Sequence, residues 1–166
     1  MTTGRGEIIK KLEDTTRDAA RQQSETLRYI LQRNGGLSYL RRYLGSYNGS
    51  VDADTFRTAV SLSRYEDYTD YINKMADGVL TDKNYGGRPL LSVDPLTCFF
   101  YSSGTSSMKP KLIPYFDSKH AKETSTMAHQ VSFANVGRLF SPTPSVNKAL
   151  WFLYAGNVAE TKGGYF

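Results

Sequence analysis

The 166-residue sequence has a single cysteine, Cys98, and no long apolar segment. One cysteine cannot form a disulfide within the chain, and we interpret Cys98 as a small buried residue rather than a nucleophile. No stretch approaches the roughly 20 apolar residues that span a bilayer, and residues 1–7 lack the apolar core of a secretory signal. These absences favour a cytoplasmic protein with no membrane partner.

Histidine is also scarce, because only His120 and His129 are present. Their nine-residue separation does not place them on one helix face a single turn apart, and no cysteine or pair of acids completes a set of metal ligands. We interpret both as surface or lightly packed residues. The sequence therefore predicts no site in which protein side chains hold a metal.

The net charge of +5 is spread along the chain rather than concentrated. Residues 1–42 carry nine Lys or Arg against five Asp or Glu, residues 43–98 five against eight, and residues 99–166 seven against three. The mixed signs of the first block favour a solvated helix face over a nucleic-acid patch. The basic third block fits an anionic small molecule equally well, and we expect no nucleic-acid partner.

Helical patterns dominate the first half of the chain. Apolar and small residues recur at intervals of three and four over Glu7–Arg33, which predicts one helix that ends at Asn34-Gly35-Gly36. We predict a short helix that Ser38 caps and Gly45 ends, and another after Asp52 or Asp54. A further helix, ending at Gly78, carries an apolar stripe that we interpret as core packing rather than a platform for bases. That stripe consists of Tyr65, Tyr68, Ile72 and Met75.

The second half mixes strands and helix. Residues 98–101 and 112–115 are predicted to be buried strands on either side of a polar loop, and residues 79–97 a loop that leads into the first of them. A long helix is predicted from Asp117 or Ser118 to about Phe140, and the apolar run Ala149–Tyr154 suggests a strand buried on both faces. The predicted fold class is mixed α/β.

The polar loop from Tyr101 to Lys111 is rich in hydroxyl side chains and contains two lysines. Short side chains let a phosphate approach backbone N–H groups, hydroxyls add donors, and Lys109 and Lys111 supply positive charge. An ordinary polar hairpin turn remains the alternative. The loop is neither a Walker A motif, since Met108 precedes Lys109, nor a dinucleotide fingerprint, since Gly104 is its only glycine.

The segment Ser102-Ser103-Gly104-Thr105-Ser106, followed by Lys111, resembles the first ATP-binding motif of the plant acyl-acid amido synthetases. These form the auxin-responsive family within the acyl-adenylate-forming superfamily. Other parts of the sequence are similar to the helix before that motif, the strand after it, and the next strand and turn. They are Tyr65–Tyr68 with Ala76–Gly78, Leu112–Pro114, and Trp151–Tyr154 with Gly163–Gly164. The resemblance extends from about Leu12 to the last residue.

The resemblance implies the N-terminal part of the large domain of an adenylate-forming, luciferase-like fold. It also implies a two-step ligase that uses ATP and Mg²⁺. A carboxylic acid of the auxin, jasmonate or benzoate type is adenylated and then joined to an amino acid. Such catalysis relies on positioning and charge stabilisation, so no side chain is assigned as catalytic.

By the same resemblance, the loop residues would bind the phosphates of ATP. Hydroxyl and N–H donors would come from Ser102, Ser103, Gly104, Thr105 and Ser106, while Lys111 would offset the phosphate charge. Gly163 and Gly164 match a segment near the acyl-acid pocket.

Two departures from the family pattern matter. Met108 stands where the family usually has a glycine, and family members are several times longer. We expect residues 1–166 to form a partial N-terminal domain that is inactive alone, in a full-length protein that is a monomer. The alternative is a non-catalytic fragment that binds a partner through an incomplete sheet with an exposed edge.

Overall fold

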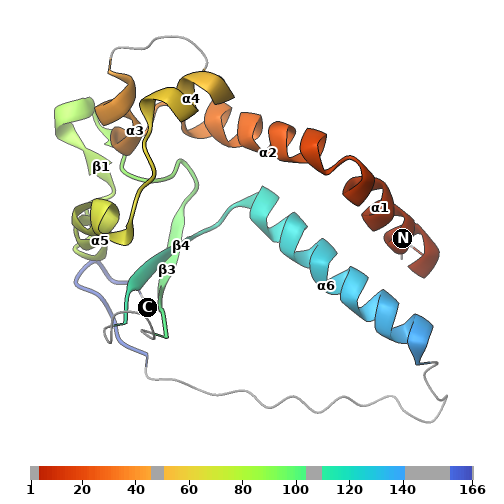
Figure 1. Ribbon diagram of the computed structural model, residues 1–166. Coiled ribbons are helices and arrows are strands. Elements are labelled where there is room, and N and C mark those ends of the chain that lie inside the picture. Colours follow the sequence, from red (N-terminus) through yellow and green to blue (C-terminus); the bar gives the residue numbers. More distant parts are fainter. Residues whose placement is uncertain (1–3, 46–50, 104–109, 141–157, 166) are drawn as a thin grey trace. The chain divides into compact units, whose positions relative to one another are not determined.

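The computed structural model describes residues 4–45, 51–103, 110–140 and 158–165 (Figure 1). It divides into two compact units. Met1–Gln22 with Ser118–Asn157 form what we call the helical unit, and Gln23–Asp117 with Val158–Phe166 form the core unit. Helices and antiparallel strands are both present, which confirms the predicted mixed α/β class.

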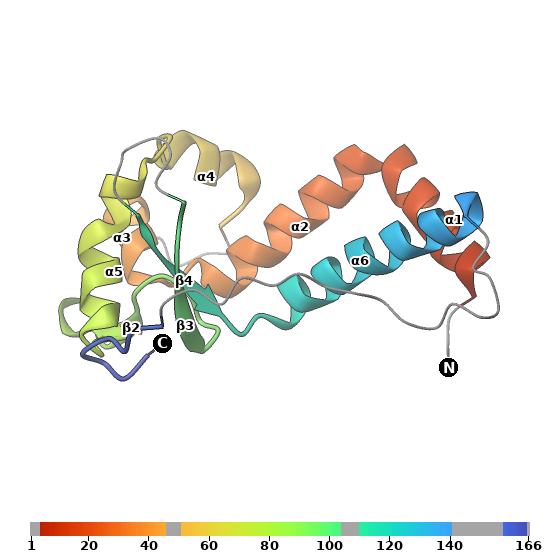
Figure 2. The ribbon, with the colours of Figure 1, turned by 90° about the horizontal axis from the view of Figure 1, so that it is seen from below.

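The helical unit contains α1 (Arg5–Arg17) and α6 (Lys119–Leu139). Both ribbon views show α1 beside the C-terminal end of α6 (Figures 1 and 2). The predicted cap of α6 is confirmed, because the Ser118 side chain accepts a hydrogen bond from the Ala121 N–H. Among the described residues of this unit, the buried hydrophobic side chains are Val131 and Ala134.

The single helix predicted over Glu7–Arg33 is wrong in one respect, because the helix is interrupted at Asp18. α1 ends at Arg17, and α2 spans Ala19–Asn34. Asp18 has φ −115° and ψ 39°, and its carboxylate pairs with Arg21 in the first turn of α2. A carboxylate is favoured at a helix start, which agrees with the beginning of α2 directly after Asp18. The apolar spacing runs through Asp18 unchanged, so the pattern gives no sign of it.

The core unit begins at Gln23 within α2 and continues with α3 (Ser38–Leu44), α4 (Ala53–Ala59), the 3-10 turn η1 (Tyr65–Tyr68) and α5 (Thr69–Ala76). Gly45 and Gly78 end α3 and α5 as predicted, with φ of 54° and 87°, a region that favours glycine. Ser38 does not cap α3, however. It is the first helical residue, and its buried hydroxyl donates to Asp82 Oδ2 at 2.9 Å.

The segment predicted as a loop over residues 79–97 contains a small hairpin. β1 (Thr81–Asp82) pairs antiparallel with β2 (Arg88–Pro89) around the 3-10 turn η2 (Lys83–Tyr85). The Leu90 N–H then donates to the Leu80 carbonyl at 3.0 Å. Strands of two residues are too short to show an alternating pattern, so the sequence does not reveal them.

The two strands predicted around the polar loop are confirmed. β3 (Leu96–Tyr101) pairs antiparallel with β4 (Leu112–Phe116), and the register places Phe99 opposite Pro114 and Phe100 opposite Ile113. The expectation that both strands are buried is wrong for one face. Phe99 is buried, whereas Phe100 is 55% exposed, because the described residues cover only one side of this hairpin.

The hydrophobic core lies between the helices of the core unit and the inner face of the β3–β4 hairpin. Its buried members are Tyr39, Leu40, Tyr71, Ile72, Met75, Leu90 and Phe99. Tyr65 and Tyr68 pack against this cluster, which confirms that the stripe is core packing. Burial raises the pKa of Tyr39 above its ordinary value, so that phenol stays protonated.

Several predicted features lie outside the described residues. They are the turn Tyr47–Ser50, the residues Gly104–Lys109 with Met108, the segment Ser141–Pro144 and the strand Ala149–Tyr154. Within the described ranges, no helix is long and apolar enough to cross a bilayer. Cys98 is free and half-buried rather than fully buried.

Candidate functional site

The polar loop leaves β3 and returns to β4 through a closed neck. The Ser102 N–H donates to the Lys111 carbonyl at 2.9 Å, and the Lys111 N–H donates to Ser102 Oγ at 2.9 Å. The first of these bonds continues the β3–β4 ladder by one backbone step, and in the second the Ser102 hydroxyl takes the place of a backbone acceptor. The loop is therefore carried by two paired strands, as the sequence predicts.

The neck brings together two of the predicted phosphate-binding residues. Ser102 uses a lone pair to accept from Lys111, so its hydroxyl hydrogen can still be donated to an anion. Ser103 follows directly and is exposed. The predicted contributions of Gly104, Thr105 and Ser106 lie outside the described residues. The described part of the site thus supplies the hydroxyl groups of Ser102 and Ser103 and the ammonium group of Lys111.

Tyr65 is the neighbour of this neck that sequence reasoning missed. The Lys111 ammonium lies 5.0 Å from the centre of the Tyr65 ring. The Tyr65 hydroxyl donates to the Leu112 carbonyl and accepts from the Leu112 N–H, both at 3.1 Å. Helical spacing correctly places Tyr65 toward the core. No sequence signal connects it with a strand 47 residues away.

The Gly163–Gly164 turn, predicted to lie near the acyl acid, packs against the C-terminal end of α5. The Gly163 N–H donates to the Ala76 carbonyl at 2.8 Å, and a Cβ on Gly163 would lie 2.5 Å from the Gly78 nitrogen. Gly164 has φ +80°. The turn places the Tyr165 ring edge-on to Phe99 at 6.0 Å. These glycines therefore have a packing role in the core unit, and their predicted role at the substrate remains a prediction.

Metal-binding side chains do not gather in the described part of the chain. No group of three or more His, Cys, Asp or Glu residues there could hold a metal ion. His129 is exposed and its Nδ1 lies 2.7 Å from the Ser125 carbonyl oxygen, whereas His120 is half-buried. The residues of the neck fit the anionic oxygens of a polyphosphate. A magnesium ion would be held there mainly by those oxygens and water.

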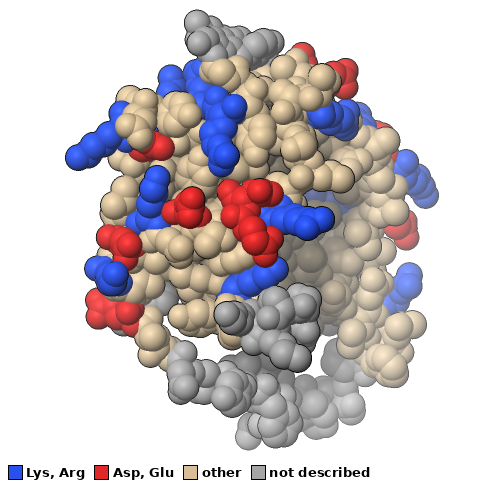
Figure 3. Space-filling model, turned by 60° about the vertical axis from the view of Figure 1, so that its left-hand side comes forward, with Lys and Arg blue, Asp and Glu red and all other residues tan. Residues whose placement is uncertain are grey.

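Charges of both signs lie side by side on the face shown in Figure 3, where acidic and basic side chains alternate. In the core unit, Arg33 on α2 forms an ion pair with Asp94 in the loop before β3. Such alternation gives no extended field of one sign on this face.

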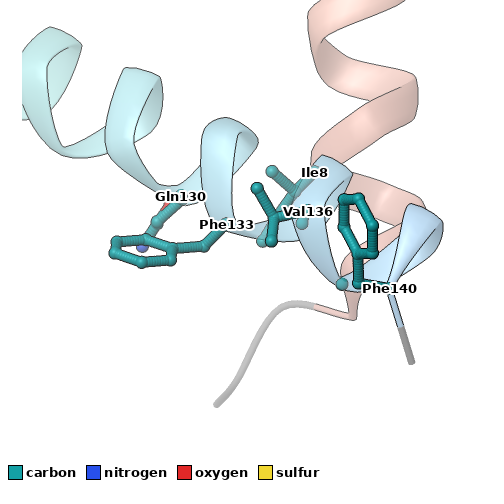
Figure 4. A pocket seen from close by; sticks show the side chains of 7 residues that line it. Ile8, Gln130, Phe133, Val136 and Phe140 are labelled. Atoms are coloured by element: carbon teal, nitrogen blue, oxygen red, sulfur yellow. The ribbon is translucent and has the colours of Figure 1, made fainter. Parts of the chain in front are cut away.

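The residues of the neck line neither of two cavities formed by described residues. In the helical unit, an apolar groove of about 440 Å³ is lined by Ile8 of α1 and by α6, where Phe133, Val136 and Phe140 border it (Figure 4). In the core unit, a cavity of about 180 Å³ lies among residues 89–96 and Phe116, where β3 begins and β4 ends. The neck joins the other ends of these strands, so neither cavity includes it.

Comparisons with known proteins agree over nearly the whole chain. A profile of the GH3 family N-terminal domain matches residues 8–166. The jasmonoyl–L-amino acid synthetase JAR6 of Nicotiana attenuata is 38% identical over 158 residues, which cover 95% of this chain and 25% of the relative. The indole-3-acetic acid-amido synthetase GH3.10 of Arabidopsis thaliana is 32% identical over 169 residues, covering 99% and 27%.

A solved structure shows the same arrangement. It is the AtGH3.15 acyl acid amido synthetase in complex with 2,4-DB, with a TM-score of 0.76 and 28% identity over 98% of this chain and 26% of that one. The mixed α/β structure described above is thus consistent with the N-terminal part of an adenylate-forming fold. The chain spans about a quarter of the length of these relatives.

Proposed function

This chain belongs to the GH3 family, whose N-terminal domain it matches, and from that premise we propose that it holds the phosphates of ATP in an acyl-acid amido synthetase. The observation that carries the proposal is the closed neck of the polar loop. Ser102 and Lys111 are bonded to each other there at 2.9 Å, with one hydroxyl hydrogen and one ammonium group available to an anion. The relatives are named as synthetases that join an acyl acid to an amino acid.

The chemistry of the neck suits the phosphates better than the other parts of the substrates. A lysine ammonium is a compact point charge, and hydroxyl and backbone N–H groups in a turn form a concave set of donors for phosphate oxygens. We assign this role to Ser102 and Lys111, and extend it to Ser103, Gly104, Thr105 and Ser106 by family resemblance. When bound, Mg²⁺ would neutralise part of the phosphate charge.

The substrate class follows from the relatives rather than from the described residues. Two relatives are named for jasmonate and indole-3-acetic acid, and the solved structure contains 2,4-DB. We propose a carboxylic acid of the auxin, jasmonate or benzoate type, together with an amino acid. Gly163 and Gly164 stay as proposed neighbours of the acyl acid.

The extent of the chain leads to a further part of the proposal. Because it spans about a quarter of its relatives, we propose that residues 1–166 are a partial N-terminal domain. In relatives of full length, most of the polypeptide lies beyond the matched region. The 166-residue chain should therefore bind ATP weakly and form no AMP, even with a panel of acyl acids and amino acids.

Nucleotide binding by the 166-residue chain tests the role of the neck. Lys111→Ala should weaken Mg·ATP binding about tenfold or more, because a hydrogen bond to a charged group is typically worth 1.5–3 kcal/mol. Lys119→Ala is the matched control, since Lys119 is exposed on α6 and makes only a 3.9 Å ion pair with Glu123. Calorimetric titration gives both affinities. Equal binding by the unaltered chain and Lys111→Ala would remove the support for this function.

A second candidate function is binding of a partner polypeptide through the β3–β4 hairpin. Its outer face carries apolar side chains that the described residues leave open, and Phe100 and Tyr115 lie edge-to-face on it at 5.5 Å. In the described residues, β3 and β4 pair only with each other, so the sheet has two edges. Sedimentation and thermal melting test this function. A cooperatively melting monomer that shows no self-association would argue against it.

A further inference from the structure

Tyr65 connects the start of η1 with the strand that receives the polar loop. Its hydroxyl donates to the Leu112 carbonyl and accepts from the Leu112 N–H, both at 3.1 Å. A phenol has one hydrogen to donate and lone pairs with which to accept. One side-chain oxygen thus satisfies both backbone polar groups of a single residue.

The ladder shows where those backbone groups point. In an antiparallel pair, hydrogen-bonded and non-hydrogen-bonded residue pairs alternate. Ser102 and Lys111 are bonded across the neck, so the adjacent pair of Tyr101 and Leu112 is non-hydrogen-bonded. The N–H and C=O of Leu112 therefore point away from β3. Tyr65 takes the place of a neighbouring strand at this one residue, directly after Lys111.

The ring of Tyr65 makes a second contact, with Lys111, the residue directly before Leu112. The Lys111 ammonium is 5.0 Å from the ring centre, within the roughly 6 Å range in which the ring quadrupole attracts a cation. A ring occupies only one side of an ammonium group, and none of the described residues forms an ion pair with the Lys111 ammonium on its other sides. The lysine is held without being neutralised, which would not be true of a carboxylate partner.

The support behind the ring is rigid. Tyr65 packs against the hydrophobic core, and its carbonyl accepts a hydrogen bond from Thr69 Oγ1 in the first turn of α5 at 3.2 Å. Asp67 accepts a hydrogen bond from the Arg64 N–H, which fixes the start of η1. The ring therefore has a defined place relative to β4.

We propose that Tyr65 is a positioning residue for Lys111. The ring of Tyr65 holds the Lys111 ammonium beside the polar loop, and the Tyr65 hydroxyl fixes the start of β4, directly after the lysine. The proposal rests on the proposed role of Lys111 in phosphate binding. This role goes beyond core packing, because packing alone does not require a contact between the Tyr65 ring and the Lys111 ammonium.

The side-chain NMR signals of Lys111 in the 166-residue chain test the contact itself. The ring should shift the Lys111 Hε protons upfield in the unaltered chain and in Tyr65→Phe, and this shift should vanish in Tyr65→Leu. Tyr85→Leu, which removes a partly exposed ring in η2, is the matched control and should leave the shift in place. Tyr65→Phe should speed hydrogen exchange at the Leu112 amide, since only the hydroxyl is lost.

Titration with inorganic tripolyphosphate and Mg²⁺ tests the consequence for binding. Tyr65→Leu should weaken binding about two- to fivefold, the range expected for a cation–π contact at a partly exposed site. Tyr65→Phe should restore most of the affinity. In a Lys111→Ala background, Tyr65→Leu should weaken binding no further, because residues that act through one contact are not additive.

The outcomes separate this inference from the proposed function. If Lys111→Ala weakens binding and Tyr65→Leu does not, the role of Tyr65 is overturned and the proposed function stands. An equal loss from Tyr65→Leu in both backgrounds means that Tyr65 acts on the fold, which also overturns its positioning role. If the unaltered chain does not bind tripolyphosphate, both proposals fail together. Should Tyr65→Leu not fold, an unshifted Lys111 signal in Tyr65→Phe would still overturn the inference.

Discussion

The core unit and the helical unit differ in how many of their apolar side chains are buried. Among the described residues, every buried hydrophobic side chain except Val131 and Ala134 belongs to the core unit. On α6 and directly after it, large apolar side chains are exposed. Phe133, Val136 and Phe140 border the groove beside α1, and Leu139 lies outside that groove. The core unit has a large buried cluster beside the exposed outer face of the β3–β4 hairpin, whereas the helical unit is held by the contact between α1 and α6.

The difference teaches where stability and function are separated in this chain. Apolar burial is the main favourable term in folding, so the core unit should dominate the free energy of unfolding. Tyr65 packs against this core and its hydroxyl bonds to Leu112, so it connects the core with the neck of the polar loop. Contiguous exposed apolar surface, as on α6, is typical of regions that contact other polypeptide. We therefore expect substitutions in the two units to have unequal effects.

The largest expected effect is the loss of a buried leucine from the core unit. Leu90 is 1% exposed, and Leu90→Ala should lower the free energy of unfolding by about 3 kcal/mol, through lost transfer free energy and the cavity left behind. Leu139→Ala makes the same change on α6, where the side chain is 69% exposed, and should alter it by less than about 0.5 kcal/mol. Urea denaturation followed by near-ultraviolet circular dichroism measures both.

Equal losses from the two leucine substitutions would contradict the comparison. Such a result would mean that the end of α6 is covered in solution, for instance by association of two chains. Repeating the denaturation of Leu139→Ala at several protein concentrations distinguishes the two cases, because only an associated state depends on concentration.

A smaller effect is expected from adding one methyl group at a close backbone contact. In Gly163→Ala the new Cβ would lie 2.5 Å from the Gly78 nitrogen, so the turn must move off the end of α5. We expect a loss of about 1–3 kcal/mol, as for other overpacked sites. Gly6→Ala in α1 is the control, because no atom lies within 4 Å of its new Cβ. It should be neutral or stabilise by about 0.5 kcal/mol.

Thermal melting of both glycine variants measures these changes. A Gly163→Ala chain as stable as the unaltered one would show that the C-terminal turn does not rest on α5. Tyr165 would then have no fixed place against Phe99, and the core unit would be smaller than described.

The sequence predicted most of the local structure because local signals are strong in this chain. Glycines with positive φ after α3 and α5, and side-chain caps at Asp52 and Ser118, mark helix ends with a physical cause. The two strands beside the polar loop are also predictable from their apolar runs. The break at Asp18 and the two-residue strands β1 and β2 leave no periodic trace, so pattern reasoning misses them.

The candidate site was predictable only in part, for a different reason. The hydroxyl-rich loop and Lys111 are contiguous in sequence, and their resemblance to a family motif identifies them. The contact between Tyr65 and Leu112 joins residues 47 apart, and nothing in either segment alone indicates it. Long-range pairing depends on how α5 packs against β4. A single sequence carries no direct signal of that packing.

The smallest expected effect compares the caps of one helix from each unit under acid. The Thr55 N–H donates to Asp52 Oδ1 at 2.7 Å at the start of α4 and holds the pKa of that carboxyl below its ordinary value of 3.8. Ser118, which caps α6, has no carboxyl to titrate. Because the folded state binds the Asp52 proton less readily than the unfolded state, this stabilisation is present above pH 3.8 and is lost as the pH falls through the lowered pKa. The Cα chemical shifts of α4 should therefore move toward coil values on acidification before those of α6.

The control is Asp52→Asn, whose amide caps a helix without titrating. In this variant α4 should no longer unfold before α6 on acidification. If α6 unfolded first in that titration, the contact between α1 and α6, and not the helix cap, would limit the stability of the helical unit.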